Sequence, residues 1–211
     1  LPALHPMSDL TRLPPDLPAP INDGGADHLR GSPVPSVTLA TSQGRSLDVG
    51  HLARLPTVLF LYPRTGRPES PAGPAWNAIP GARGCTPQAC GFRDLHQSFA
   101  TRGVRVFGVS TQTPEYQREF AARVFAPFEF LSDQHLRLAR AMRLPTFEFP
   151  VESGGPTTLL KRMALFLDQG RVEQVWYPVF PPDDNAQQVL TWLRLHRPDT
   201  IEYGRATLGG V

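Results

Sequence analysis

The 211-residue chain lacks the features that define several protein classes. Its two cysteines are too few for a zinc ribbon, an iron–sulfur cluster or a disulfide-rich secreted scaffold. Only 19% of its residues are charged, and the 21 basic residues are scattered, with Lys161 the single lysine and a net charge of +2. This pattern argues against nucleic-acid and membrane-surface partners. No apolar run reaches the roughly 20 residues of a membrane span, and no signal-peptide pattern is present.

Proline is abundant, and its positions divide the chain. Eight of the 24 prolines lie in residues 1–35, so residues 1–32 are predicted to form an extended surface arm with few helical residues. Residues 1–6 precede Met7, and the sequence leaves open whether they are native. The fold interpretation therefore omits them.

Beyond the arm, strand and helix patterns alternate across a single domain predicted over residues 33–198, followed by a tail over 199–211. Hydrophobic periodicity and capping residues predict strands at 36–40, 57–62, 104–110, 128–131, 164–168 and 172–177, and helices at 87–101, 113–124, 132–142 and 183–196. This order predicts an α/β fold of three layers, with a mixed central sheet flanked by helices.

Cys85 and Cys90 are the first candidates for chemistry. Cys85 follows a strand, a long proline-rich loop and a glycine, and Arg83 precedes it by two residues. A helix start and a nearby arginine both stabilise a thiolate, which is the reactive form of cysteine. Two residues five apart in one helix have Cα atoms roughly 8–9 Å apart, so a disulfide between them needs local unwinding. The spacing alone also fits two ordinary buried thiols.

The surrounding residues narrow this choice. The segment LYP at 61–63 follows an apolar strand, and GCTPQACGFRD occupies 84–94. Together they resemble the peroxiredoxins of the bacterioferritin-comigratory (Q) type, and similar segments at 106–110, 127–133 and 162–168 extend the resemblance over roughly 33–195. The resemblance implies a thioredoxin-like fold.

It also implies roles for particular residues. Cys85 matches the peroxidatic cysteine, Cys90 the resolving cysteine, Arg162 the arginine that holds thiolate and peroxide, and Pro63 the proline that shields the site. The implied activity is that of an atypical 2-Cys, thiol-dependent peroxidase. It would reduce hydrogen peroxide and organic hydroperoxides through a sulfenic acid on Cys85 and an intramolecular Cys85–Cys90 disulfide, which thioredoxin or a similar dithiol reduces again.

The chain departs from the family motif before the first cysteine. Pro63 lies 22 residues before Cys85 instead of seven, which we interpret as an insertion over residues 66–81. Ala82 stands where the family has a threonine, and Thr65 is the nearest candidate to replace it. Without Thr65, backbone amides at the helix start would have to stabilise the leaving oxygen alone.

The remaining expectations follow from the resemblance. No metal, haem or flavin is implied, and the expected location is the cytoplasm. Members of this type are often monomers, although the insert with Trp76 leaves a dimer contact open, as it does a lid over the site or a neutral surface loop. Two alternatives stay open: a peroxide-responsive redox sensor, and a non-enzymatic binding module whose site the insert has disabled.

Overall fold

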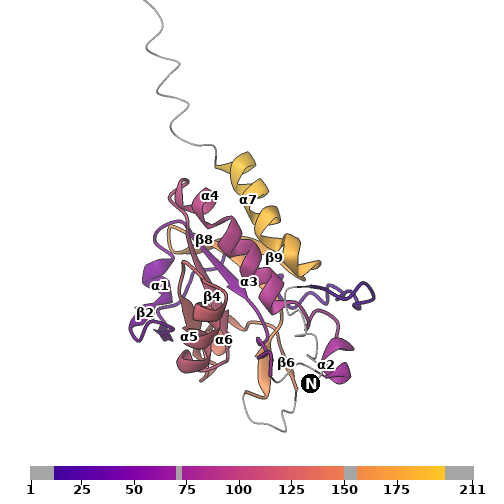
Figure 1. Cartoon of the computed structure of the whole chain (residues 1–211). Coiled ribbons are helices and arrows are strands. Elements are labelled where there is room, and N and C mark those ends of the chain that lie inside the picture. The colour runs from indigo at the N-terminus through magenta and orange to yellow at the C-terminus, as the bar shows by residue number, and fades with distance from the viewer. Residues whose placement is uncertain (1–11, 70–72, 150–155, 198–211) are drawn as a thin grey trace, which may run out of the picture.

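A seven-stranded mixed sheet forms the centre of the molecule, in the order β2-β1-β5-β4-β3-β8-β9 (Figure 1). The computed structural model describes residues 12–69, 73–149 and 156–197. β3 pairs in parallel with β4 and antiparallel with β8, which makes the sheet mixed. The predicted α/β architecture, three layers around a mixed sheet, is therefore confirmed.

The elements have the following bounds. The strands are β1 Thr38–Thr41, β2 Ser46–Asp48, β3 Thr57–Leu61, β4 Arg105–Ser110, β5 Phe130–Ser132, β6 Thr146–Glu148, β7 Thr158–Leu160, β8 Met163–Asp168 and β9 Arg171–Trp176. The helices are α1 Val49–Leu52, α2 Pro74–Asn77, α3 Cys85–Asp94, α4 His96–Ala100, α5 Pro114–Arg123, α6 Arg137–Met142, the 3-10 turn η1 Pro182–Asp184, and α7 Asn185–His196. In the described ranges, no helix combines the length and apolar character needed to cross a bilayer.

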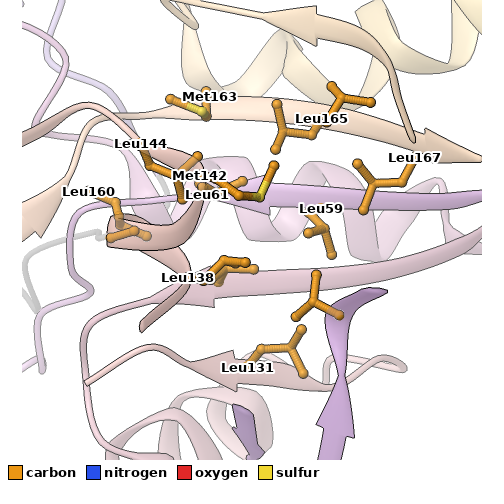
Figure 2. Packing of buried hydrophobic residues seen from close by; sticks show 14 of the residues in the cluster. Leu59, Leu61, Leu131, Leu138, Met142, Leu144, Leu160, Met163, Leu165 and Leu167 are labelled. Carbon is orange, nitrogen blue, oxygen red and sulfur yellow. The ribbon is translucent and has the colours of Figure 1, made fainter. Parts of the chain in front are cut away.

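β3 is central because its side chains enter both layers of the core. All five of its residues are buried, and successive side chains of a strand point to opposite faces. Leu59 and Leu61 pack with β8 leucines and with Leu138 of α6 on one face, as Figure 2 shows. Its apolar sequence therefore fits a strand covered on both sides.

The other face carries an aromatic layer beneath the helices that hold the site. Phe60 stacks on Phe92 of α3 with ring centroids 4.5 Å apart, and meets Phe130 of β5 edge to face. Leu190 and its neighbours in α7 complete this layer. α3 is thereby fixed to the sheet through Phe92, about two turns after Cys85.

Several local predictions were inaccurate. The helix predicted over 87–101 begins at Cys85 and is split at Leu95 into α3 and α4. The helix predicted over 132–142 begins only at Arg137, although Asp133 does accept backbone N–H bonds from its first turn, as expected of a cap. The short strands β2, β6 and β7 were not predicted.

The described part of the predicted arm, residues 12–32, packs into the core as well as lying on the surface. Residues 12–32 form turns and contain no helix and no strand. Within them, however, Ala26 and Leu29 are buried in the same core cluster as Leu59. The segment therefore contributes to the packing of the domain, which its proline and glycine content did not indicate.

Gly108 in β4 lets two aromatic rings meet across the sheet. A Cβ at this position would lie 2.4 Å from a ring atom of Phe130 and 2.8 Å from one of Phe60. We expect Gly108→Ala to lower the free energy of unfolding by about 1–3 kcal/mol through overpacking, measured by urea titration. Gly73→Ala is the control, because nothing lies within 4 Å of the added carbon. Equal midpoints for the two variants would contradict this view of the core.

Candidate active site

The first residue of α3 is Cys85, whose side chain is buried. Gly84 precedes it with φ +106°, a conformation that favours glycine. A Cβ on Gly84 would also lie 2.3 Å from Pro182, so η1 approaches too closely for any side chain there. The Gly-Cys pair thus places the sulfur at the helix start, against the body of the protein.

Arg162 lies between β7 and β8 and is buried, with 3% of its surface exposed. One of its terminal nitrogens, Nη2, lies 3.2 Å from Sγ of Cys85. Its guanidinium also donates to the carbonyl oxygens of Gly81, Ala82 and Arg83 and to the side-chain oxygen of Gln88. Two residues 77 positions apart in the sequence are therefore brought into direct contact.

The guanidinium of Arg162 has no charged partner among the described residues. Every oxygen bound to Arg162 belongs to a neutral carbonyl or amide, and among the described residues no carboxylate pairs with it. A buried cation without an anion is costly, and a negative charge on the Cys85 sulfur offsets that cost. The geometry therefore places an uncompensated positive charge in direct contact with the Cys85 sulfur.

Gln88 and Asn185 support Arg162 and were not identified from the sequence. Gln88 is fully buried in α3, accepts from Arg162 through Oε1, and donates through Nε2 to Oδ1 of Asn185, 2.9 Å away. Because the guanidinium only donates, the amide of Gln88 must present its oxygen to it. Its spacing of three residues from Cys85, on the same helix face, was the available signal.

The backbone at the start of α3 supplies further donors. The amides of Cys85 and Thr86 precede the first intrahelical bond, and no acceptor is found for them within the described ranges. Pro87 has no N–H, and Gln88 already donates to the carbonyl of Gly84. Two amides therefore remain to bind developing negative charge near the sulfur.

Thr65 and Arg83 do not contact the cysteine as the sequence suggested. The hydroxyl of the buried Thr65 lies 3.2 Å from Oε1 of Gln112, which also accepts from the Thr65 amide. Arg83 contributes its carbonyl oxygen to Arg162, and no bond from its side chain to Cys85 is found in the part of the chain that the structure describes. Pro63 is buried two residues after the end of β3 at Leu61.

Cys90 lies in the same helix, α3, and both thiols are free. It is half-buried, and this burial raises the pKa of its thiol above the ordinary value. With four residues between them in one helix, Cys85 and Cys90 are too far apart for a disulfide. Any bond between them requires α3 to unwind.

The proposed insert packs against its own chain. Trp76 in α2 is buried, with its ring 5.1 Å from that of Phe149 and 6.2 Å from that of Phe147 in β6. The carbonyl oxygen of Gly81, the last residue of the insert, accepts a hydrogen bond from Nε of Arg162. The segment thus returns to the site and takes part in holding the arginine.

Comparisons with known proteins agree with this geometry. The Redoxin family profile matches residues 29–190, most of the chain. The chain belongs to the Redoxin family. Among curated members, it is 28% identical to "Peroxiredoxin Q, chloroplastic" of Sedum lineare over 180 residues, which cover 85% of this chain and 86% of that protein. The corresponding Populus jackii protein is 27% identical over 165 residues, 78% of this chain and 68% of that protein.

Solved Redoxin-type structures include peroxidoxin BcpB of Mycobacterium tuberculosis, with a TM-score of 0.63 and 26% identity, covering 80% of this chain and 98% of that one. Peroxiredoxin Q of Xanthomonas campestris shares the fold with a TM-score of 0.60 and 24% identity, over 76% and 90% of the two chains. These findings confirm the resemblance to bacterioferritin-comigratory, Q-type peroxiredoxins and the class of thiol-dependent peroxidases.

Arg162 is expected to set the rate of peroxide attack. Arg162→Ala removes the charge beside the sulfur and should slow oxidation of Cys85 by hydrogen peroxide about 10²–10³-fold. Gln88→Leu leaves one guanidinium N–H unsatisfied and should slow it by about tenfold. Stopped-flow measurement of the second-order rate constant checks both, with the exposed Arg54→Ala as control. If Arg162→Ala reacts as fast as Arg54→Ala, Arg162 takes no part in peroxide attack.

The raised pKa of Cys90 predicts how its reactivity depends on pH. Because the folded helix favours the neutral thiol, α3 is most stable below the ordinary thiol pKa and loses that stability as pH rises through the raised value. In Cys85→Ser, where Cys90 is the single thiol, the pH midpoint of iodoacetamide alkylation should be higher in the native protein than in urea. Mass spectrometry measures the rates, and identical midpoints would contradict the assignment.

Proposed function

We propose that Cys85 is the peroxidatic cysteine of this thiol-dependent peroxidase. The observation that carries the proposal is the contact between the Cys85 sulfur and the uncompensated guanidinium of Arg162, 3.2 Å away. The thiolate attacks one oxygen of a hydroperoxide, so an S–O bond forms while the O–O bond breaks. The leaving oxygen takes up a proton and departs as water or an alcohol, and sulfur is left as a sulfenic acid.

Arg162 and the amides at the start of α3 lie where this charge moves. As negative charge passes from sulfur to the leaving oxygen, donors already in place need no reorganisation. Arg162 is one such donor, and the free N–H groups of Cys85 and Thr86 are the others. In this scheme Pro63 shields the site, and Thr65 orders the loop after β3 through Gln112 instead of contacting peroxide.

Cys90 then resolves the sulfenic acid. Unwinding of α3 removes Cys90 from its half-buried position and relieves the burial that raises its pKa, which favours its nucleophilic thiolate. This thiolate attacks the Cys85 sulfur, so the S–S bond forms while the S–O bond of the sulfenic acid breaks, and the hydroxyl takes up a proton and leaves as water. A dithiol protein of the thioredoxin kind returns both cysteines to thiols by exchange.

We also propose a cellular location and an oligomeric state for the protein. A cytoplasmic location fits a cycle that depends on a compartment where thiols are kept reduced. A monomer is supported by Trp76, whose burial against its own chain removes the ring from the surface of the insert.

The experiment follows the mass of the reduced protein after one equivalent of hydrogen peroxide. We expect rapid loss of two hydrogens, mapped by peptides to a Cys85–Cys90 bond. Cys90→Ser should react once and stop at a sulfenic acid on Cys85, and Cys85→Ser should show no fast reaction. Oxidation no faster than that of a free thiol would refute the assignment.

The same assay separates the alternatives. A redox sensor would form the bond but turn over slowly with thioredoxin and bind a partner only when oxidised. A binding module would leave Cys85 unreactive. No contact in the described structure favours either over the peroxidase.

A further inference from the structure

One face of α3 consists of two glycines and a glutamine, and the start of α7 packs against it. Gly84, Gln88 and Gly91 are spaced by four and then three residues, which places them on the same side of a helix. A Cβ on Gly84 would overlap the ring of Pro182 in η1. A Cβ on Gly91 would lie 3.1 Å from the carbonyl oxygen of Asp183. In Figure 1, α7, drawn in yellow, runs beside α3. The two glycines therefore let the chain at the start of α7 approach α3 closely.

The arm also packs against the start of α3. Leu13 lies 3.0 Å from the place of a Cβ on Gly84, where Pro182 lies as well. Pro20 lies 3.3 Å from the place of a Cβ on Gly81, whose carbonyl accepts from Arg162. The first turn of α3 and the chain before it are therefore in contact with two segments that are distant in the sequence, the arm and η1.

Between the two glycines, Gln88 bonds to Asn185, the first residue of α7. Nε2 of Gln88 donates to Oδ1 of Asn185 over 2.9 Å, and both side chains are fully buried. Nδ2 of Asn185 is buried too, and within the described ranges it has no hydrogen-bond partner. An unsatisfied buried donor costs stability, so an apolar residue would fill this place better if packing were its role. The side-chain oxygen of Asn185 is therefore the atom that the site uses.

α7 is a fixed support for this bond. Val189, Leu190 and Leu193 are fully buried against the aromatic layer. The ring of Trp192 lies with its centroid 5.6 Å from that of Phe166 in β8. α7 is thus attached to the sheet independently of α3, so it stays in place when α3 unwinds.

Formation of the disulfide has to break the contact between α3 and α7. Cys85 and Cys90 both lie within the span from Gly84 to Gly91, and α3 must unwind before the two sulfurs can bond. Unwinding from either end separates at least one of these two glycines from η1. A locally unwound state becomes rarer as the contacts that hold the folded segment become stronger. Docking of α3 on α7 therefore slows the resolving step.

The same bond has the opposite effect on the attack of peroxide. Because Nε2 of Gln88 is held by Asn185, Oε1 of Gln88 faces the guanidinium of Arg162. Arg162 is thereby kept 3.2 Å from the Cys85 sulfur. Without the acceptor on α7, that bond no longer fixes which end of the Gln88 amide faces Arg162. The Asn185 oxygen therefore helps to keep the positive charge beside the reacting sulfur.

We propose that Asn185 is a positioning residue with opposite effects on the two chemical steps of the cycle. Through Gln88 and Arg162 it speeds the attack of peroxide on sulfur. Through the docking of α3 it slows resolution by Cys90. Asn185 thus sets the lifetime of the sulfenic acid between the two steps. The proposal rests on the proposed function and deepens it, since it concerns the rates at the same site.

The test measures the two steps separately with hydrogen peroxide. The Cys90→Ser background gives the rate of attack on Cys85. With both cysteines present, acid quenching and mass measurement give the conversion of sulfenic acid to disulfide, at peroxide concentrations where attack is complete first. Asn185→Ala should slow attack about fivefold and speed resolution about tenfold.

Gln187→Ala is the matched control, because it removes an exposed amide from the same helix, one that bonds to Thr191 within α7. It should change neither rate by more than about twofold. Unless attack slows and resolution speeds in Asn185→Ala relative to this control, the assignment is overturned.

Two further variants separate positioning from a general loss of stability. Pro182→Ala loosens the docking at Gly84 and should also speed resolution, which keeps the proposal testable if Asn185→Ala does not fold. Leu138→Ala opens a cavity in the core on the other face of the sheet. It should lower the free energy of unfolding and alter neither rate. If Leu138→Ala reproduces the rates of Asn185→Ala, or if Pro182→Ala does not speed resolution, the proposal is refuted.

The unaltered chain shows which proposal fails. If its Cys85 does not react with peroxide, or if Cys90 does not form the bond, the proposed function is wrong. If the unaltered chain completes the cycle and Asn185→Ala matches Gln187→Ala, the role of Asn185 alone is wrong.

Discussion

A buried arginine without a carboxylate partner is the constraint on which the site depends. Arg162 is held by backbone carbonyls and by Gln88, all neutral, so the sulfur of Cys85 is the place where a balancing negative charge can form. To supply those carbonyls, the end of the insert must return to β8. To supply the sulfur, α3 must begin without a side chain at Gly84. The backbone at the end of the insert and at the start of α3 is therefore arranged around the guanidinium of Arg162.

The site lies between a sheet whose central strands are buried and α3, a helix of low intrinsic stability. β3, β4 and β8 are buried on both faces, whereas α3 starts without a side-chain cap and contains Gly91. Both features of α3 lower the intrinsic stability of a helix. The helix is attached by Phe92 in the aromatic layer and by the bond from Gln88 to Asn185 of α7. The ten residues of α3 thus combine the position of the Cys85 sulfur with a helix of low intrinsic stability.

The sequence was informative where chemistry or periodicity is local. The family resemblance, which the cysteine motif carries, implied that Arg162 lies beside Cys85, and the apolar run of β3 predicted a doubly covered strand. Short elements such as β6, with three residues, carry too little periodicity to detect. Thr65 was a candidate on proximity in sequence, and tertiary packing directs it to Gln112 instead.

The contact between Leu13 and Gly84 carries a consequence for the arm. If the first turn of α3 unwinds to bring the two sulfurs together, the arm loses the surface on which Leu13 rests. Formation of the Cys85–Cys90 bond would then alter the packing of the arm as well as the helix. The redox state of the two thiols would be coupled to the position of a segment that lies far from them in the sequence.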